Sequence, residues 1–218
     1  MLFLYLLVFM PTAHAQTPAQ VAVASAKEAA ANAAAALSDA NDALKDALAT
    51  LSSDSNNQAS DSQLKDDSNV VSAAQVAVDN CSNAAQSASD AYGNAQTAAN
   101  NNEATAAQQY SAEAQKSAND AQADSQIAEA ADDNYNDGVG DPNSSGATTD
   151  TGLDQAIRNL ATAQNNLVDA ETNATQNPND PAAQQAVVDA KGALSQAQDG
   201  VDLSREIASN TPTPDDDK

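Results

Sequence analysis

The sequence predicts an all-α protein, built from elongated, Ala-rich antiparallel coiled-coil hairpins with about five helices, a polar loop and a polar tail. Three observations predict this fold. Small and aliphatic residues recur at alternating steps of three and four; residues that start and stop helices lie at the ends of these runs; and large residues of one run face small residues of the next when the chain folds back. Alanine, which dominates the runs, has the highest intrinsic helix propensity.

The first fifteen residues, MLFLYLLVFMPTAHA, differ from the rest of the chain. Their apolar run is too short to span a bilayer comfortably, and it is followed by the small-x-small pattern Ala13-His14-Ala15. We interpret residues 1–15 as a secretory signal peptide cleaved after Ala15, although no Lys or Arg precedes the apolar run. A retained N-terminal anchor is the alternative. The expected protein is therefore secreted and extracellular.

Cleavage leaves a chain without His, Phe, Trp or Met, in which Leu, Val and Ile number 24 among 203 residues. The formal net charge is -23. So few large apolar residues with so high a charge are typical of disordered proteins. Disorder is thus the structural alternative to the helical periodicity.

Four runs keep a heptad spacing and predict helices over residues 18–51, 60–99, 152–176 and 181–209. Asp67 is the one charged residue in their seams. The first seam is Val23, Ala26, Ala30, Ala33, Leu37, Ala40, Leu44, Ala47 and Leu51, and the second is Leu64, Asp67, Val71, Ala74, Val78, Cys81, Ala85, Ala88, Tyr92, Ala95 and Ala99. The last two are Leu153, Ala156, Leu160, Ala163, Leu167, Ala170 and Ala174, then Ala183, Val187, Ala190, Leu194, Ala197, Val201, Ser204 and Ala208.

A further helix is predicted over residues 103–131, with a less specific register. Its seam holds no large side chain and leaves Ile127 outside, so this segment is alternatively a continuation of the second helix. The seam consists of Ala104, Ala107, Ser111, Ala114, Ala118, Ala121, Ser125 and Ala128.

Helix-terminal residues agree with the runs. Thr17 to Gln20 and Ser60 to Gln63 both fit the capping box, in which the hydroxyl and the Gln side chain exchange hydrogen bonds with the backbone. The sequence NPNDP at 177–181 combines a stop, Asn177-Pro178, with a cap and first-turn proline, Asp180-Pro181. It therefore predicts the turn of a helical hairpin.

Folding the chain back at its turns predicts which residues face each other. About NPNDP, Leu194 faces Ala163, and about a turn at 52–59, Val78 faces Ala33 and Tyr92 faces Ala19. Large side chains opposite small ones allow two helices to approach closely. The predicted organisation is a signal peptide (1–15), a three-helix bundle (16–131), an Asp/Asn/Gly-rich loop (132–151), a helical hairpin (152–209) and a disordered acidic tail (210–218).

Composition argues against enzymatic function. After cleavage no imidazole is left, Cys81 stands alone, and the eight Lys and Arg are scattered. Carboxylate pairs carry no signal among 31 Asp and Glu. The net charge and the lack of a basic patch also argue against binding to nucleic acid and, after signal cleavage, to membranes.

A weak calcium site is the one cofactor that the sequence suggests. Asp133, Asp137 and Asp141 occupy positions one, five and nine of a calcium-loop frame with Gly138 at six. Tyr135 at position three and Ser144 at position twelve depart from the EF-hand pattern. The alternative is an Asp/Asn/Gly turn selected for backbone freedom.

Cys81 and three asparagines are candidate modification sites. An unpaired cysteine in a secreted chain is a candidate for an intermolecular disulfide, although a seam position also suits a small apolar thiol. Asn80, Asn143 and Asn173 begin N-x-Ser/Thr sequons, which matter only in a eukaryotic secretory pathway.

The leading hypothesis is a secreted, non-enzymatic structural protein that self-associates into a filament, matrix or surface layer. One alternative is an ice-active or surface-active helical protein, for which the irregular Thr spacing is unfavourable. The other is a disordered, acidic, hydrating protein.

Overall fold

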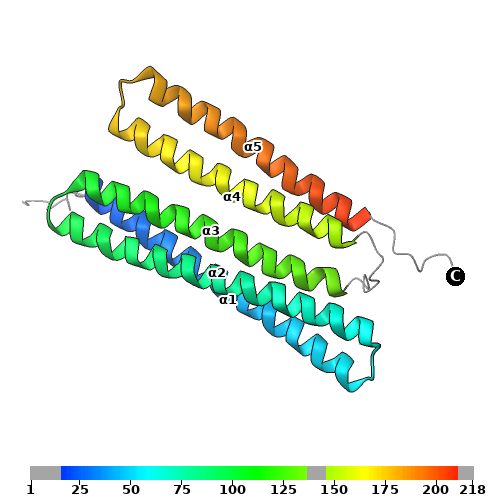
Figure 1. The fold of residues 1–218 in the computed structure, drawn as a ribbon. Helices are drawn as coiled ribbons and strands as arrows, with labels where there is room; N and C mark the ends of the chain where they lie inside the picture. The colour runs from blue at the N-terminus through cyan, green and yellow to red at the C-terminus, as the bar shows by residue number, and fades with distance from the viewer. Residues whose placement is uncertain (1–15, 137–145, 211–218) are drawn as a thin grey trace, which may run out of the picture.

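The computed structural model describes the backbone of residues 16–136 and 146–210, and side chains in these ranges except at 62, 63, 66, 131–136, 146–151 and 208–210. Within them the chain forms five α-helices and no strand, which confirms the all-helical prediction. The helices are α1 (Pro18–Asn56), α2 (Asp61–Asn100), α3 (Ala104–Asn136), α4 (Gly146–Gln176) and α5 (Pro181–Asn210). They lie side by side along one long direction (Figure 1). At 1.5 Å per residue the 30- to 40-residue helices are about 45 to 60 Å long.

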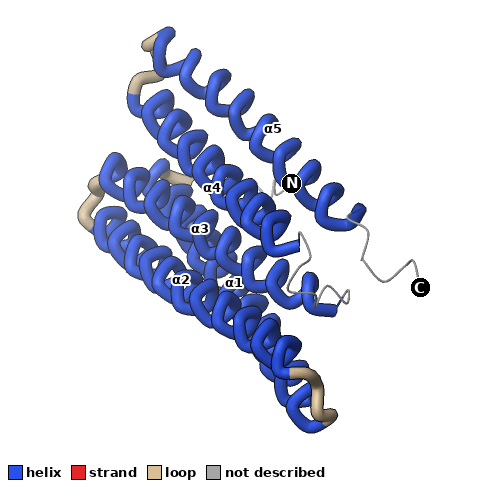
Figure 2. The backbone as a smooth tube through the Cα atoms, turned by 45° about the vertical axis from the view of Figure 1, so that its right-hand side comes forward, coloured by secondary structure: helices blue, strands red, loops and turns tan. Residues whose placement is uncertain are grey.

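The five helices form a bundle of three that is joined to a hairpin of two. Helices α1, α2 and α3 all pack against one another, α4 packs against α3 and α5, and α5 packs against α4 alone among the described elements. Figures 1 and 2 show the α4–α5 hairpin lying along α3. Helix α3 therefore has three neighbours, whereas α5 has one.

Two helix ends follow the predicted capping chemistry, while the side chain of Gln63 in the capping box predicted at Ser60 lies outside the described residues. Thr17 and Gln20 form the capping box: the Thr17 hydroxyl accepts from the Gln20 N–H at 3.3 Å, and the Thr17 N–H donates to Gln20 Oε1 at 2.9 Å. At the other predicted turn, α4 ends at Gln176 and α5 begins at Pro181. The Ala182 N–H donates to Asp180 Oδ1 at 2.9 Å, so Asp180 caps α5. NPNDP is a turn between two helices, as predicted.

Three predicted boundaries were wrong because helices continue into polar residues. α1 ends at Asn56 and not at 51, α3 ends at Asn136 and not at 131, and α4 begins at Gly146 and not at 152. The predicted loop of 132–151 is thus helical at both ends. Ser, Thr, Asn and Asp cost well under 1 kcal/mol each in a helix. A helix that is already packed therefore continues through them.

α3 is a separate helix and does not continue α2. The chain turns at residues 101–103, where Asn102 has φ 61° and the Glu103 N–H donates to the Ala98 carbonyl at 2.9 Å. Asparagine tolerates this left-handed conformation better than most residues. The run of Asn100, Asn101 and Asn102 is therefore a helix terminus.

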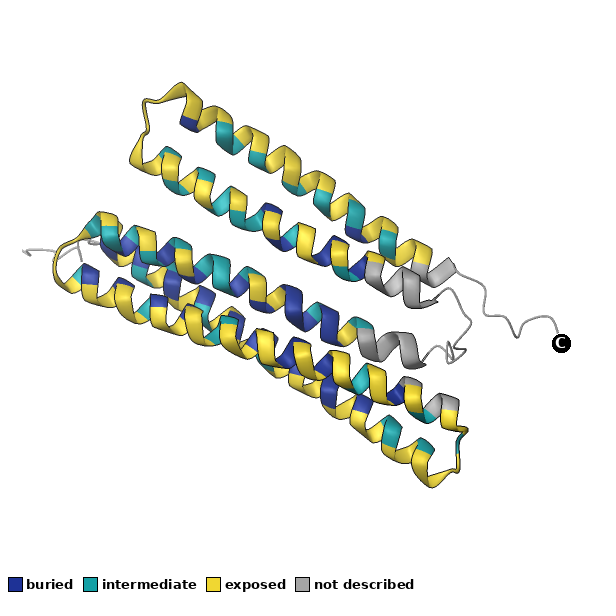
Figure 3. Cartoon of the chain, in the orientation of Figure 1, coloured by how far each residue is buried: buried dark blue, intermediate teal, exposed yellow. Residues whose placement is uncertain are grey.

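The buried residues, dark blue in Figure 3, are mainly alanines. In α1 the seam residues Val23, Leu37 and Leu51 are only half-buried, whereas Ala22 and Ala36, which precede the first two in sequence, are buried. α1 packs on two helices, and the smallest side chains lie where the three helices are closest. The buried residues of α1 are Ala19, Ala22, Ala26, Ala29, Ala33, Ala36, Ala40, Ala43, Leu44 and Ala47.

The predicted seams of α2 and α3 face inward. In α3 seven of the eight seam residues are buried and Ala104 is half-buried. A seam of only Ala and Ser suits this helix, since it has three neighbours that must all approach it closely. In α2 the acidic seam residue Asp67 is 2% exposed, so its carboxyl group is buried.

The predicted register of the first hairpin was wrong. Ala19 and Ala22 form a core cluster with Ala98 and Ala107, whereas Tyr92 packs against the separate, larger cluster of the bundle. The turn lies at residues 57–60 and not at 52–59, because α1 extends to Asn56. This extension moves the residues of α2 that face α1 toward its C-terminus.

Among the described helices, none combines the length and apolar character needed to cross a membrane.

Candidate functional site

The interface between α3 and α4 joins the two parts of the molecule. Its apolar part is formed by Ile127 and Ala123 of α3 with Ile157 and Ala161 of α4, all of them buried and in one core cluster. Ile157 is 2% exposed and is among the largest fully buried side chains that the structure describes. None of the four residues belongs to a predicted seam. This second face of each helix holds the hairpin against the bundle.

An ion pair with a buried carboxylate and a half-exposed guanidinium lies beside this apolar contact. Arg158 Nη1 of α4 is 3.3 Å from Asp124 Oδ1 of α3, whose side chain is only 9% exposed. Burial raises the pKa of Asp124 from its ordinary value, and the nearby Arg158 guanidinium opposes that rise. Burial likewise raises the pKa of Asp154, one turn before Arg158. Asp124 of α3 and Asp154 of α4 are therefore carboxyl groups that are costly to ionise.

Polar contacts continue along the interface toward the α4–α5 turn. The Asn165 side chain accepts from Asn119 Nδ2 at 3.0 Å and donates to Asp120 Oδ1 at 2.9 Å. Further along, Lys116 Nζ is 2.8 Å from Asp169 Oδ1. These exposed or half-exposed bonds orient the two helices but each contributes little to stability.

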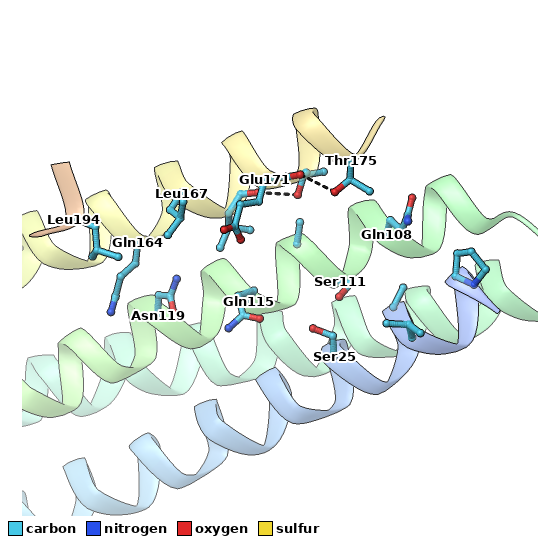
Figure 4. Close-up of a pocket in the computed structure, with 16 residues that line it drawn as sticks. Ser25, Gln108, Ser111, Gln115, Asn119, Gln164, Leu167, Glu171, Thr175 and Leu194 are labelled. Carbon is cyan, nitrogen blue, oxygen red and sulfur yellow. Dashed lines mark hydrogen bonds between the residues drawn. The ribbon is translucent and has the colours of Figure 1, made fainter. Parts of the chain in front are cut away.

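Beyond these contacts a groove of about 520 Å³ opens between α1, α3 and α4. Figure 4 shows Gln115 and Asn119 of α3 facing Gln164 and Glu171 of α4 across it, with Leu194 of α5 at one end. Its apolar lining includes Val21, which is 51% exposed. The lining consists of Pro18, Val21, Ala22 and Ser25 of α1; Gln108, Ser111, Ala112, Gln115 and Asn119 of α3; Gln164, Leu167, Val168, Glu171, Thr172 and Thr175 of α4; and Leu194.

The groove offers amides, hydroxyls and aliphatic groups. Glu171 is the one charged residue of its lining, and Lys191 Nζ lies 3.6 Å from Glu171 Oε1. The Thr172 and Thr175 hydroxyls donate to the carbonyls of Val168 and Glu171, at 2.7 and 2.8 Å. Acid–base catalysis needs a titratable group whose pKa is matched to the task, and this lining offers one carboxylate beside an ammonium group. The groove is suited to packing and hydrogen bonding with an uncharged surface.

Cys81 lies in the core of the three-helix bundle. It is fully buried, and its thiol donates to the Ala121 carbonyl of α3 at 3.3 Å. Burial, with smaller contributions from the Asp124 and Asp39 charges, raises the pKa of Cys81 to about 11. The thiol therefore stays protonated at neutral pH and is a poor nucleophile and a poor metal ligand. An intermolecular disulfide at Cys81 remains a prediction, and it requires the bundle to open.

The other predicted site residues are not brought together by the described part of the chain. Asp133 lies in the last turn of α3, while Asp137, Asp141 and the sequon residue Asn143 lie outside the described residues. Within the described ranges no three His, Cys, Asp or Glu side chains are grouped so that they could hold a metal ion. The remaining sequon residues, Asn80 and Asn173, are exposed on α2 and α4. Calcium binding and glycosylation remain predictions.

The sequence had not predicted the groove or the α3–α4 contact. One signal of the contact was present, since Ile127 and Ile157 are large aliphatic residues that lie outside their seams. A large apolar residue off the main seam indicates a second buried face. The groove has no comparable signal, because its lining comes from four helices and consists of residue types that are common throughout the chain.

Comparison with family models, with curated proteins and with solved structures gave no match.

Proposed function

We propose that the protein is a secreted, non-enzymatic structural protein whose Ala-rich coiled-coil hairpins assemble into a filament, matrix or surface layer. Long helices with cores of alanine give a slender molecule, and such molecules bury little surface per residue when alone. Association between copies adds the missing burial. The proposal rests on the incomplete packing of the last helix.

Incomplete packing of α5 is the observation that carries the proposal. Of the described α5 side chains only Ala183 and Val201 are buried, and the other predicted seam residues up to Ser204 are half-buried. By contrast, ten residues of α1 are buried. The difference follows from the neighbours, since α1 packs on two helices and α5 on one. A further copy of the chain would give α5 the second neighbour that the fold does not provide.

The described chemistry supports a non-enzymatic role. The Cys81 thiol is buried with its pKa near 11, and the groove lining holds a single carboxylate that lies near Lys191. An ice-active surface is less consistent with the threonines. Thr50, Thr97 and Thr162 each donate to the carbonyl four residues earlier, and they follow no regular repeat.

Circular dichroism combined with light scattering after size-exclusion chromatography tests the proposal. The expected result is a strongly helical protein that forms large species as its concentration rises. A helical protein that stays monomeric at every concentration would refute the structural role and favour an interfacial one. Low helicity would refute the fold as well and favour the disordered, hydrating polyanion.

A further inference from the structure

The outward face of α5 carries an unusual set of exposed apolar residues. Val188, Leu203 and Ile207 are 62%, 58% and 50% exposed, and they make up half of the large exposed hydrophobic residues that the structure describes. Of the other three, Val21 and Leu48 lie far apart on α1, and Val76 lies on α2. Scattered single apolar residues are ordinary on a surface. Three exposed apolar residues on one face of α5, the helix with a single neighbour, are not ordinary in this sense.

These residues belong to a continuous stripe along α5, which we call the outer stripe. It consists of Val188, Gly192, Gln196, Asp199, Leu203 and Ile207, all exposed. Successive members are four, four, three, four and four residues apart, which keeps them within roughly 100° of the helix circumference. The side chains that face α4, such as Val201, lie on the opposite side of α5. The stripe is therefore a second seam that no other helix among the described residues covers.

The residue spacings of the outer stripe are the same from the N-terminal end as from the C-terminal end. When a second α5 lies antiparallel on the first, Leu203 of each copy faces Gly192 of the other, Val188 faces Ile207, and Gln196 faces Asp199. Leu203 then meets a residue without a side chain, Val188 and Ile207 form an apolar pair, and the Gln196 amide meets a carboxylate that can accept its hydrogen bond. Because the same stripe serves both copies, the contact has two-fold symmetry.

Gly192 has no evident role within one copy. A Cβ added there would meet nothing within 4 Å, so packing inside the molecule does not require glycine. Glycine in a helix interior costs about 1 kcal/mol relative to alanine. In the antiparallel pair, by contrast, the missing side chain leaves room for Leu203 of the second copy.

We propose that two copies of this protein associate through the outer stripe of α5, antiparallel and about a two-fold axis between Gln196 and Asp199. The inference rests on the proposed function and names the first step of assembly, since a two-fold contact closes after two copies. One pair of helices, about 30 Å long over the stripe, belongs to the class of small and weak interfaces. The dimer is therefore concentration-dependent. Each copy carries a formal net charge of -23, so salt strengthens the contact by screening the repulsion between the two copies.

Sedimentation or light scattering of the purified protein, residues 16–218, tests the contact in about 0.5 M NaCl, where charges are screened over a few Å. Leu203→Glu places a charge in the contact and should raise the dimer dissociation constant at least tenfold. The matched control is Leu48→Glu, since Leu48 is similarly exposed at 47% but lies on α1. This control should dimerise like the unmodified protein.

A second pair of variants tests the fit of the stripe without adding charge. Gly192→Val should fill the space that Leu203 of the second copy occupies and should weaken the dimer at least tenfold. Gly93→Val on α2 is the control, because a Cβ there also meets nothing within 4 Å. Circular dichroism of each variant shows whether the helices are intact. Equal dimerisation by Gly192→Val and Gly93→Val would overturn the proposed register.

Cross-linking tests the antiparallel direction. Protein carrying Gly192→Cys is mixed with protein carrying Leu203→Cys in a glutathione redox buffer, where the buried Cys81 is not accessible. The mixed disulfide should exceed both symmetric ones, because bonded cysteines need Cα atoms within about 7 Å. A dominant Leu203→Cys homodimer would instead show a parallel pair and overturn the proposal.

The outcomes separate this inference from the proposed function. If the unmodified protein forms dimers or larger species that Leu203→Glu leaves unchanged, assembly uses another surface: the inference fails and the structural role stands. If the unmodified protein is monomeric at the highest attainable concentration, both fail. Loss of association in Leu203→Glu with retention in Leu48→Glu supports both.

Discussion

Replacing Ala33 by leucine tests whether the helices of the bundle are as close as the alanine core requires. Ala33 is 0% exposed in α1, and it belongs to a core cluster that spans α1 to α5. Leucine adds three carbon atoms to a site that close packing leaves without free volume. Overpacking of this kind costs about 1 to 3 kcal/mol.

The sign of the effect is as informative as its size. If the helices left room at Ala33, three added carbons would gain roughly 0.8 kcal/mol each from burial and would stabilise the protein by about 2 kcal/mol. In the close-packed bundle the melting temperature should instead fall by about 2 to 4 °C per kcal/mol. Thermal unfolding followed by circular dichroism measures this shift.

Ala35→Leu is the matched control, since Ala35 lies on the exposed side of the same turn. A surface substitution with similar helix propensity should change stability by less than about 0.5 kcal/mol. An unchanged or higher melting temperature in Ala33→Leu would refute the close approach of the helices, and with it the account of how alanine forms this core.

Three other predictions concern the hairpin and its attachment. Raised pKa values of Asp124 and Asp154 mean that the folded state binds protons more tightly than the unfolded state, so stability is gained as pH falls below the raised values and lost as pH rises through them. Melting temperatures of Asp124→Asn between pH 4 and 7 should therefore show a weaker pH dependence than the unmodified protein, and an identical slope would contradict this. Ile157→Ala should lower the free energy of unfolding by about 2 to 5 kcal/mol, whereas Val188→Ala at an exposed site should lower it by less than about 0.5 kcal/mol. Similar chemical-denaturation midpoints for the two variants would show that the packing of α3 on α4 does not depend on Ile157. Ala163→Leu should lower the free energy of unfolding by about 1 to 3 kcal/mol, because it overfills the site that Leu194 is predicted to face. An unchanged denaturation midpoint would rule out the predicted register of the α4–α5 hairpin.

Local chemistry explains which parts of the fold were predictable. The turn at NPNDP and the capping box at Thr17 were predicted correctly because proline geometry and capping hydrogen bonds act over a few residues. The α3 seam was predicted from spacing alone and is buried. The C-terminal end of α1 was placed five residues too early, since polar residues with weak preferences mark a helix end poorly, and that error shifted the register of the first hairpin.

The candidate site was less predictable than the helices. Calcium-loop residues and sequons were suggested by pattern, but the groove is lined by four helices and the Asp124–Arg158 pair joins residues 34 positions apart on two helices. Asp124 is one of 31 acidic residues, and its place in sequence does not show that it is buried. Burial of a carboxyl group depends on which helix lies over it.

The sequence by itself determined the helices, most of their ends and the inward faces of α2 and α3, because periodicity and capping are properties of neighbouring residues. Only the tertiary structure decided that α3 is central, that Ile127 and Ile157 join the hairpin to the bundle, and that α5 keeps one face open. A short turn fixes how two adjacent helices pair. The contact between α3 and α4 depends instead on a second face of each helix, and many such faces are similar in a chain so rich in alanine.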